Sequence, residues 1–95
     1  MIFGNKIRRL RDEHGVLQRQ LAAYLEIDTP MFSKIERGDR RAKREQVVKL
    51  AAYFHQDVEE MLTLWLADKI LDALDGELKL GSQAIKVANE YIKFM

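Results

Sequence analysis

Apolar side chains recur along this chain at the three- and four-residue spacing that places them on one face of an α-helix. Phe3, Ile7 and Leu10 begin the pattern, with charged side chains on the other faces. Gly15 follows, and a glycine there can adopt the left-handed backbone that commonly ends a helix. The first segment is therefore predicted to be an amphipathic helix that ends at Gly15.

The same spacing, read together with capping and breaking residues, predicts five further helices. Asp28 is a suitable N-cap, and Pro30 suits the first turn of the helix that follows it. Asp57 and Ser82 are N-cap candidates for the last two helices. The predicted helices cover about residues 17–25, 29–37, 44–54, 58–74 and 83–94. No segment alternates as a strand would, so the predicted fold class is all-α.

Length and composition are typical of one soluble globular domain. The chain has 95 residues, of which 47% are apolar and 33% charged, so it is too apolar to remain disordered. The net charge is only +1, but its distribution is uneven. Residues 1–44 hold 11 Lys and Arg against 6 Asp and Glu, whereas residues 45–95 hold 5 against 9. This asymmetry predicts a basic binding half and an acidic half with a different task.

The residues that the chain lacks disfavour several function classes. There is no cysteine, which excludes disulfides, thiolate zinc sites and a thiol nucleophile. His14 and His55 are the only histidines, and neither has further ligands at metal-binding spacing; His14 is better interpreted as a helix C-terminal cap. No phosphate-binding glycine loop or nucleophile motif is present. We therefore expect no enzymatic activity, no metal and no cofactor.

The chain also carries no sign of a membrane-spanning or secretory segment. Its longest apolar run, residues 61–67, falls far short of the roughly 20 residues needed to cross a bilayer. The first residues are charged where a signal peptide would need an apolar core. These features predict a cytoplasmic protein that does not bind a membrane.

Residues 18–37 form the most informative unit, two short predicted helices joined by a tight turn. In a helix-turn-helix the second helix enters the major groove, so it needs an apolar inner face and an outer face of small or polar groups. Phe32 and Ile35 supply the inner face. Lys34 could donate to a guanine edge, and Pro30 could pack on a thymine methyl. The predicted base-reading residues are Thr29, Pro30, Ser33 and Lys34.

Five basic side chains follow within residues 37–44. Lys43 and Arg44 stand at the start of a predicted helix, where positive charge opposes the helix dipole by about 0.3–1 kcal/mol each. A helix N-terminus flanked by cations is also a good phosphate site, and a bound phosphate would offset that cost. A solvated basic loop is the alternative, but the neighbouring helix-turn-helix favours phosphate contacts. The residues predicted to make them are Arg37, Arg40, Arg41, Lys43 and Arg44.

Several of these elements together resemble the Xre family of regulators, which includes the lambda Cro and repressor DNA-binding domains. The resemblance is carried by Gly4, Ile7-Arg8, Leu10-Arg11, Gln18, Leu21-Ala22, Ser33 and Ile35-Glu36-Arg37-Gly38. It covers about residues 2–63 and implies a five-helix lambda-repressor-like domain that binds operator DNA as a dimer. We therefore expect a helix-turn-helix domain over residues 1–63 and an additional helical extension over residues 64–95, packed as one compact unit.

The resemblance also implies roles for single residues. Gln18 is expected to touch a phosphate and to brace the second helix of the motif. Arg11 and Glu36 are expected to form a structural ion pair that holds this helix at its angle. The chain departs from the family pattern at Leu17, where a Ser or Thr usually caps the first helix of the motif, so that helix start is expected to be less well satisfied.

The predicted helix over residues 58–74 is apolar on more than one side, which is more than a five-helix domain can cover. The final helix is expected to cover part of this surface and a second chain the rest, whereas a larger monomeric core is the alternative. We therefore predict a homodimer whose interface consists of Leu62, Trp65, Leu66, Ile70, Ile85 and Ile92.

Together these patterns predict a sequence-specific transcriptional regulator, a repressor, that binds double-stranded DNA at an inverted repeat as a dimer. The alternative is an antitoxin-type or restriction–modification control protein whose acidic second half binds a protein partner. The operator sequence and any small-molecule effector are left open.

Overall fold

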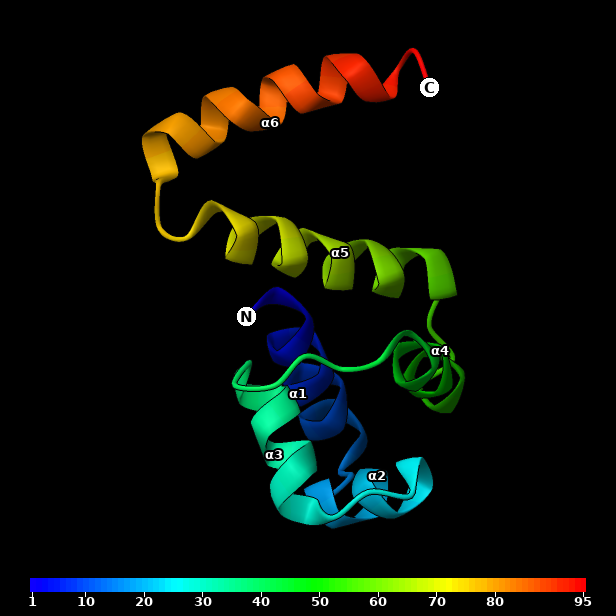
Figure 1. The fold of residues 1–95 in the computed structure, drawn as a ribbon. Helices are drawn as coiled ribbons and strands as arrows, with labels where there is room; N and C mark the ends of the chain where they lie inside the picture. The colour runs from blue at the N-terminus through cyan, green and yellow to red at the C-terminus, as the bar shows by residue number, and fades with distance from the viewer.

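Six helices joined by short turns make up the structure, a computed structural model that describes residues 1–95. They are α1 (Ile2–His14), α2 (Gln18–Leu25), α3 (Thr29–Arg37), α4 (Arg44–Tyr53), α5 (Val58–Leu74) and α6 (Leu78–Ile92). There is no strand, so the predicted all-α fold class is confirmed. The first four helices lie on one side of α5, and α6 lies on the other (Figure 1). None of the six is long and apolar enough to cross a membrane.

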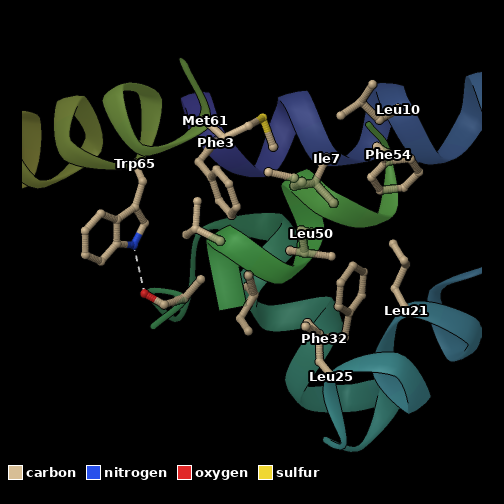
Figure 2. Packing of buried hydrophobic residues seen from close by; sticks show 14 of the residues in the cluster. Phe3, Ile7, Leu10, Leu21, Leu25, Phe32, Leu50, Phe54, Met61 and Trp65 are labelled. Atoms are coloured by element: carbon tan, nitrogen blue, oxygen red, sulfur yellow. Dashed lines mark hydrogen bonds between the residues drawn. The ribbon is translucent and has the colours of Figure 1, made fainter. Parts of the chain in front are cut away.

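One apolar core joins α1 to α5. The predicted inward residues of α1, Phe3, Ile7 and Leu10, are buried in it together with Phe32 of α3 and Leu50 of α4 (Figure 2). Around this core α1 packs on α3 and α5, α2 packs on α3 and α4, and α4 packs on α5. Burying a side chain of this size contributes about 1.5–3 kcal/mol, so the shared core fixes how the five helices lie against one another.

Aspartate side chains cap two of the helices as predicted. Asp28 Oδ1 accepts a hydrogen bond from the Met31 amide at 2.7 Å at the start of α3, and Pro30 occupies the first turn. Asp57 Oδ1 accepts from the Glu59 amide at 3.1 Å at the start of α5. These bonds satisfy amides that have no partner within the helix, so both helices begin where the sequence predicts.

Glutamine side chains support the starts of α2 and α4, whose N-cap residues, Leu17 and Lys43, cannot accept a hydrogen bond through their side chains. Gln20 Oε1 accepts from the Leu17 amide at 2.7 Å, and Gln46 Oε1 accepts from the Lys43 amide at 2.8 Å. Each glutamine lies three residues into its helix, which is the position from which a side chain reaches back to the N-cap amide. The start of α2, expected to be weak because of Leu17, therefore has half of a capping box.

The start of α6 differs from the prediction. The helix begins at Leu78, about one turn before the predicted residue 83, so Ser82 lies inside it and does not act as its N-cap. Asp75 and Gly76 adopt left-handed backbone angles, with φ of 48° and 80°, and together they turn the chain back sharply after α5. Helical geometry resumes at once, and this leaves no room for the predicted loop before Ser82.

The packing of α6 sets it apart from the other helices. Gly81 is its only buried residue, and it lies against Leu74 at the end of α5. Every other residue of α6 is exposed, so α6 projects from the domain beside α5 (Figure 1). Apart from Gly81, α6 therefore adds nothing to the core of this chain, because the tight turn directs the helix away from it.

Candidate nucleic-acid interface

The helix α3 has one face in the core and the opposite face in solvent. Phe32 and Ile35 are only 0% and 5% exposed, which anchors the inner face. The residues on the outer face are Thr29, Pro30 and Lys34, which are exposed, and Ser33, which is half-buried. This outer face presents hydroxyl groups, an ammonium group and a proline ring, which can contact base edges or a thymine methyl in a major groove.

A partly buried ion pair ties the last turn of α3 to α1. Arg11 donates to Glu36 twice, from Nε to Oε2 at 3.0 Å and from Nη2 to Oε1 at 2.9 Å. The Glu36 side chain is 5% exposed and that of Arg11 15%, so little water competes for these bonds. The hydrogen bonds that Arg11 donates to the Glu36 carboxylate raise the pKa of the Arg11 guanidinium above its ordinary value, and the arginine stays charged.

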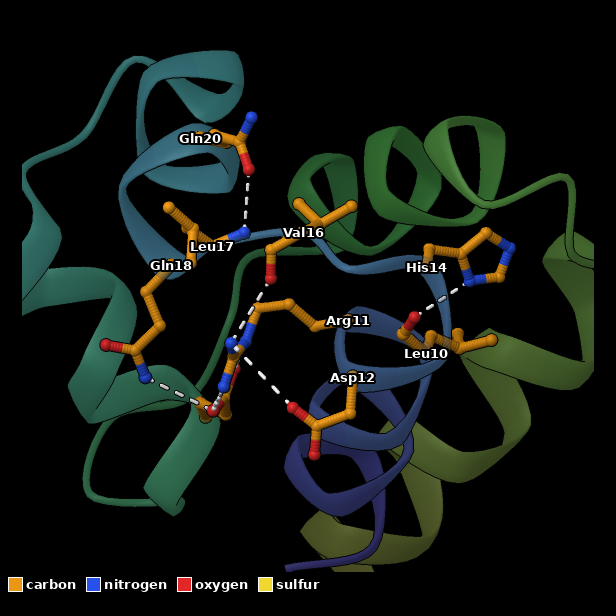
Figure 3. A network of polar contacts seen from close by, with 9 residues as sticks. Leu10, Arg11, Asp12, His14, Val16, Leu17, Gln18 and Gln20 are labelled. Atoms are coloured by element: carbon orange, nitrogen blue, oxygen red, sulfur yellow. Dashed lines mark hydrogen bonds and ion pairs between the residues drawn. The ribbon is translucent and has the colours of Figure 1, made fainter.

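Gln18 adds α2 to the same network. Its Nε2 donates to Glu36 Oε1 at 3.1 Å, and Arg11 Nη1 donates to the Val16 carbonyl oxygen at 3.2 Å (Figure 3). Side chains from α1 and α2 therefore meet on one carboxylate of α3. Because these bonds are charge-assisted and the pairing with Arg11 is bidentate, they fix the orientation of α3 against both helices.

The close crossing of α1 and α3 depends on Gly4. A Cβ atom at this position would lie 2.2 Å from the carbonyl oxygen of Glu36, a distance that no side chain can occupy. The sequence singles out Gly4 only as part of a family motif, and the structure supplies the physical reason for it. The α1 backbone touches the turn of α3 that carries Glu36, which brings Arg11 within reach of its partner.

Two of the five basic side chains in residues 37–44 are engaged within the protein. Arg37 donates to Ser33 Oγ at 2.7 Å and to Asp39 Oδ2 at 3.1 Å. Arg41 forms an ion pair with Asp72 of α5. All of these groups are partly exposed, and exposed ion pairs contribute little to stability, so both arginines can exchange their carboxylate partners for phosphate at small cost.

The other three basic residues of this segment are exposed. Arg40 forms no ion pair, and Lys43 and Arg44 lie at the N-terminal end of α4. The guanidinium of Arg44 stands 6.0 Å from the centroid of the Trp65 ring, and Lys69 Nζ stands 4.2 Å from it. These cation–π contacts place positive charge beside the start of α4, where backbone amides already favour an anion.

The buried carboxylate of Asp68 on α5 holds the start of α1 and was not identified from the sequence. Asp68 is 6% exposed, and its Oδ1 and Oδ2 accept hydrogen bonds from the Ile2 and Phe3 amides, both at 2.9 Å. A carboxylate in this place satisfies free helix amides and complements the helix dipole. The available signal was its position, because Asp68 lies seven residues after the buried Met61 on the same helix face.

The residues predicted to form a dimer interface separate into two groups. Trp65 is 6% exposed, and its Nε1 donates to the Ala42 carbonyl oxygen at 2.8 Å, so it belongs to the core and is not available to a partner (Figure 2). Its ring is large enough to reach from α5 to the segment before α4. Leu62 is half-buried against the core. The remaining four, Leu66, Ile70, Ile85 and Ile92, are between 42% and 63% exposed.

Neither histidine belongs to a candidate metal site. His14 Nδ1 is 2.8 Å from the Leu10 carbonyl oxygen at the end of α1, the position of a C-terminal cap, and His55 is exposed after α4. No three His, Cys, Asp or Glu side chains gather into a group that could hold a metal ion.

Two consecutive short helices joined by a tight turn, the second held by its neighbours and exposed along its outer face, define a helix-turn-helix unit. A family model described as a helix-turn-helix domain matches residues 2–64, which is more than half of the chain. The protein therefore belongs to this family, whose members are DNA-binding domains. No curated protein and no solved structure matches the chain.

Proposed function

We propose that this protein is a sequence-specific transcriptional regulator of the Xre type, which binds double-stranded DNA with α3 in the major groove. The observation that carries the proposal is the orientation of α3. Its inner face is locked in the core, its last turn is held by the pair of Arg11 and Glu36, and its outer face is free. Thr29, Pro30, Ser33 and Lys34 would then read base edges.

The basic side chains of residues 37–44 supply most of the salt-dependent affinity in this proposal. Arg40, Lys43 and Arg44 are exposed and ready to meet phosphates, and Arg37 and Arg41 would move to phosphates from exposed carboxylate partners. Gln18 adds a contact from the start of α2. Each phosphate neutralised in this way releases condensed counterions, so the affinity for any DNA falls as salt rises.

The proposed binding unit is a homodimer on an inverted repeat. Two copies would each place one α3 in a half-site, with half-site centres about 34 Å apart along the DNA. A protein that covers such a site excludes other proteins from it, which favours repression as the regulatory outcome. The exposed apolar residues of α5 and α6 are consistent with pairing of two copies.

The same exposed apolar residues support a second candidate function. An antitoxin-type or restriction–modification control protein would use the acidic half of the chain to bind a different protein while keeping its DNA-binding domain. Leu66, Ile70 and Tyr91 are among the large apolar side chains that such a partner could cover.

Selection of binding sites from random duplex DNA tests the proposed function. The purified chain is incubated with the library at two salt concentrations, and bound DNA is sequenced over several rounds. We expect enrichment of a short inverted repeat, and an affinity that falls steeply as salt rises. Weak binding without sequence preference would contradict the proposal and would favour the protein-partner function.

A further inference from the structure

The helices α5 and α6 form an open V whose inner side is apolar. On α5, Leu66, Ile70 and Leu71 point away from the domain core and are 43–50% exposed. On α6, Gly81, Ile85, Ala88 and Ile92 follow one another at helical spacing and share one face. Gly81 touches Leu74 at the apex of the V, so this face of α6 is the one turned toward α5.

The turn at the apex holds the two helices apart. Between Leu74 and Gly81 the backbone is fixed by three hydrogen bonds, from the Glu77 amide to the Leu74 carbonyl at 3.0 Å, from Leu78 to Gly76 at 2.9 Å, and from Gly81 to Glu77 at 2.7 Å. Closing α6 onto its own α5 would require this turn to rearrange. The apolar faces of α5 and α6 therefore do not cover each other within one chain and are open to another molecule.

The size of the exposed surface fits a protein interface. The exposed fractions of the large apolar residues of α5 and α6 amount to roughly 600 Å² of side-chain surface, and to roughly 800 Å² with Phe94 and Met95. A standard interface buries about 800 Å² on each partner. A lone 15-residue helix is also only marginally stable in water, so α6 needs a covering surface to persist.

A second copy of this chain is the occupant that the dimensions of the two helices favour. The helices have 17 and 15 residues, or about 25 Å and 22 Å in length, so their arms match. A two-fold axis would let each V accept the α6 of the other.

We propose that two copies interlock, with α6 of each chain lying between α5 and α6 of the other, so that the dimer is held by reciprocal exchange of its last helix. This inference specifies the dimer of the proposed function and builds on it. Lys79 and Lys86 lie seven residues apart on the polar face of α6, and Lys93 follows at the same spacing just after the helix; this face stays in solvent in this arrangement. Each copy thereby completes the apolar cluster that the other leaves open.

Light scattering on the full chain measures the dimer. We expect the wild type to have twice the 11.1 kDa chain mass at about 100 µM, and the double variant Ile85→Asp/Ile92→Asp to have the monomer mass. The matched control is Lys86→Asp/Asn89→Asp, which places two aspartates on the polar face of α6 and should leave the dimer intact. Because these four side chains lie outside the core, the fluorescence of Trp65 should show that the domain stays folded in every variant.

Cross-linking tests the exchange itself. Because the chain has no native cysteine, only the introduced cysteines can react. Ile70→Cys on α5 and Ala88→Cys on α6 are prepared as separate chains, mixed, allowed to exchange and treated with a short bismaleimide. We expect a covalent pair that contains one chain of each kind. Asn89→Cys, on the polar face of α6, replaces Ala88→Cys in the control and should give little of this product.

Four outcomes would overturn the exchange. In light scattering, they are a wild type that stays monomeric at about 100 µM and a dimer that survives Ile85→Asp/Ile92→Asp. In cross-linking, the exchange is overturned if Ile70→Cys reacts with Ala88→Cys only when both substitutions are in the same chain. The fourth outcome is a chain that stays monomeric and inserts α6 into anionic phospholipid vesicles. The DNA selection is a separate measurement. A monomer that selects a sequence refutes only the exchange, whereas an interlocked dimer that selects none refutes only the DNA-binding function.

Discussion

Removing the carboxylate of Glu36 tests whether the ion pair holds the fold around α3. Glu36→Ala deletes three hydrogen bonds, two from Arg11 and one from Gln18. The Arg11 side chain, 15% exposed, would keep the Val16 carbonyl at 3.2 Å and the distant Asp12 carboxylate at 4.0 Å. Breaking a buried pair by removing one partner costs about 3–5 kcal/mol, since the remaining charge is left unpaired. Because Arg11 is partly exposed and keeps the Val16 carbonyl, we expect a loss near the lower end of this range in the free energy of unfolding.

Urea unfolding followed by circular dichroism and by Trp65 fluorescence measures this loss. Glu36→Gln keeps the shape and one acceptor oxygen, so it should fall between the wild type and Glu36→Ala. The double variant Arg11→Met/Glu36→Met removes both charges, and an apolar replacement of similar volume should recover most of the stability. The double variant should then fold but discriminate less between the selected DNA sequence and its single-base variants, because α3 is no longer held at its last turn.

A loss of less than about 1 kcal/mol in Glu36→Ala would refute this reasoning, because it would place the pair in the energy range of surface ion pairs. The reasoning would also fail if the double variant were as unstable as the two single variants added together. Additive losses would mean that Arg11 and Glu36 act independently, whatever the distance between their atoms.

Three further predictions concern the DNA-binding surface and its support. Lys34→Ala should relax base preference at one or two positions of the selected site, by about 1–3 kcal/mol against the wrong base; an unchanged preference would remove Lys34 from the base-reading set. Arg40→Ala/Arg41→Ala should weaken binding to all sequences alike and reduce the salt slope by about 2, as seen in titrations at several salt concentrations; a change confined to one sequence would contradict phosphate contact. Asp68→Ala should lower the free energy of unfolding by about 1–3 kcal/mol, because the Ile2 and Phe3 amides lose their acceptor, and an unchanged urea midpoint would show that water replaces it.

The faces of the first five helices could be predicted from the sequence because the apolar spacing is local. Phe3, Ile7 and Leu10 share a face in any α-helix, and a face of that width must be buried in a soluble domain. The cap at Asp28 is local as well, since its acceptor and the Met31 amide are three residues apart.

Contacts between distant elements could not be predicted from the spacing alone. The pair of Arg41 and Asp72 joins residues 31 positions apart, and nothing local distinguishes Asp72 from the other acidic residues of its helix. Asp68 is a similar case. Its position in an apolar stripe predicts that it is buried, but not that the Ile2 and Phe3 amides donate the hydrogen bonds that offset the cost of burying a carboxylate. The sequence likewise indicates which side of α6 is apolar, while the direction in which α6 leaves α5 depends on the backbone at Asp75 and Gly76.

The helix α5 connects the proposed DNA-binding surface to the proposed dimer surface. Its inner side holds Ala42 through Trp65 and the start of α1 through Asp68. Its outer side forms one arm of the apolar V. Because these contacts lie along one continuous helix, the position of the partner copy fixes the basic segment and α3 of both copies relative to each other. Half-site spacing should therefore depend on how α5 and α6 pair, and a variant that changes this pairing while keeping the dimer should select half-sites at a different spacing.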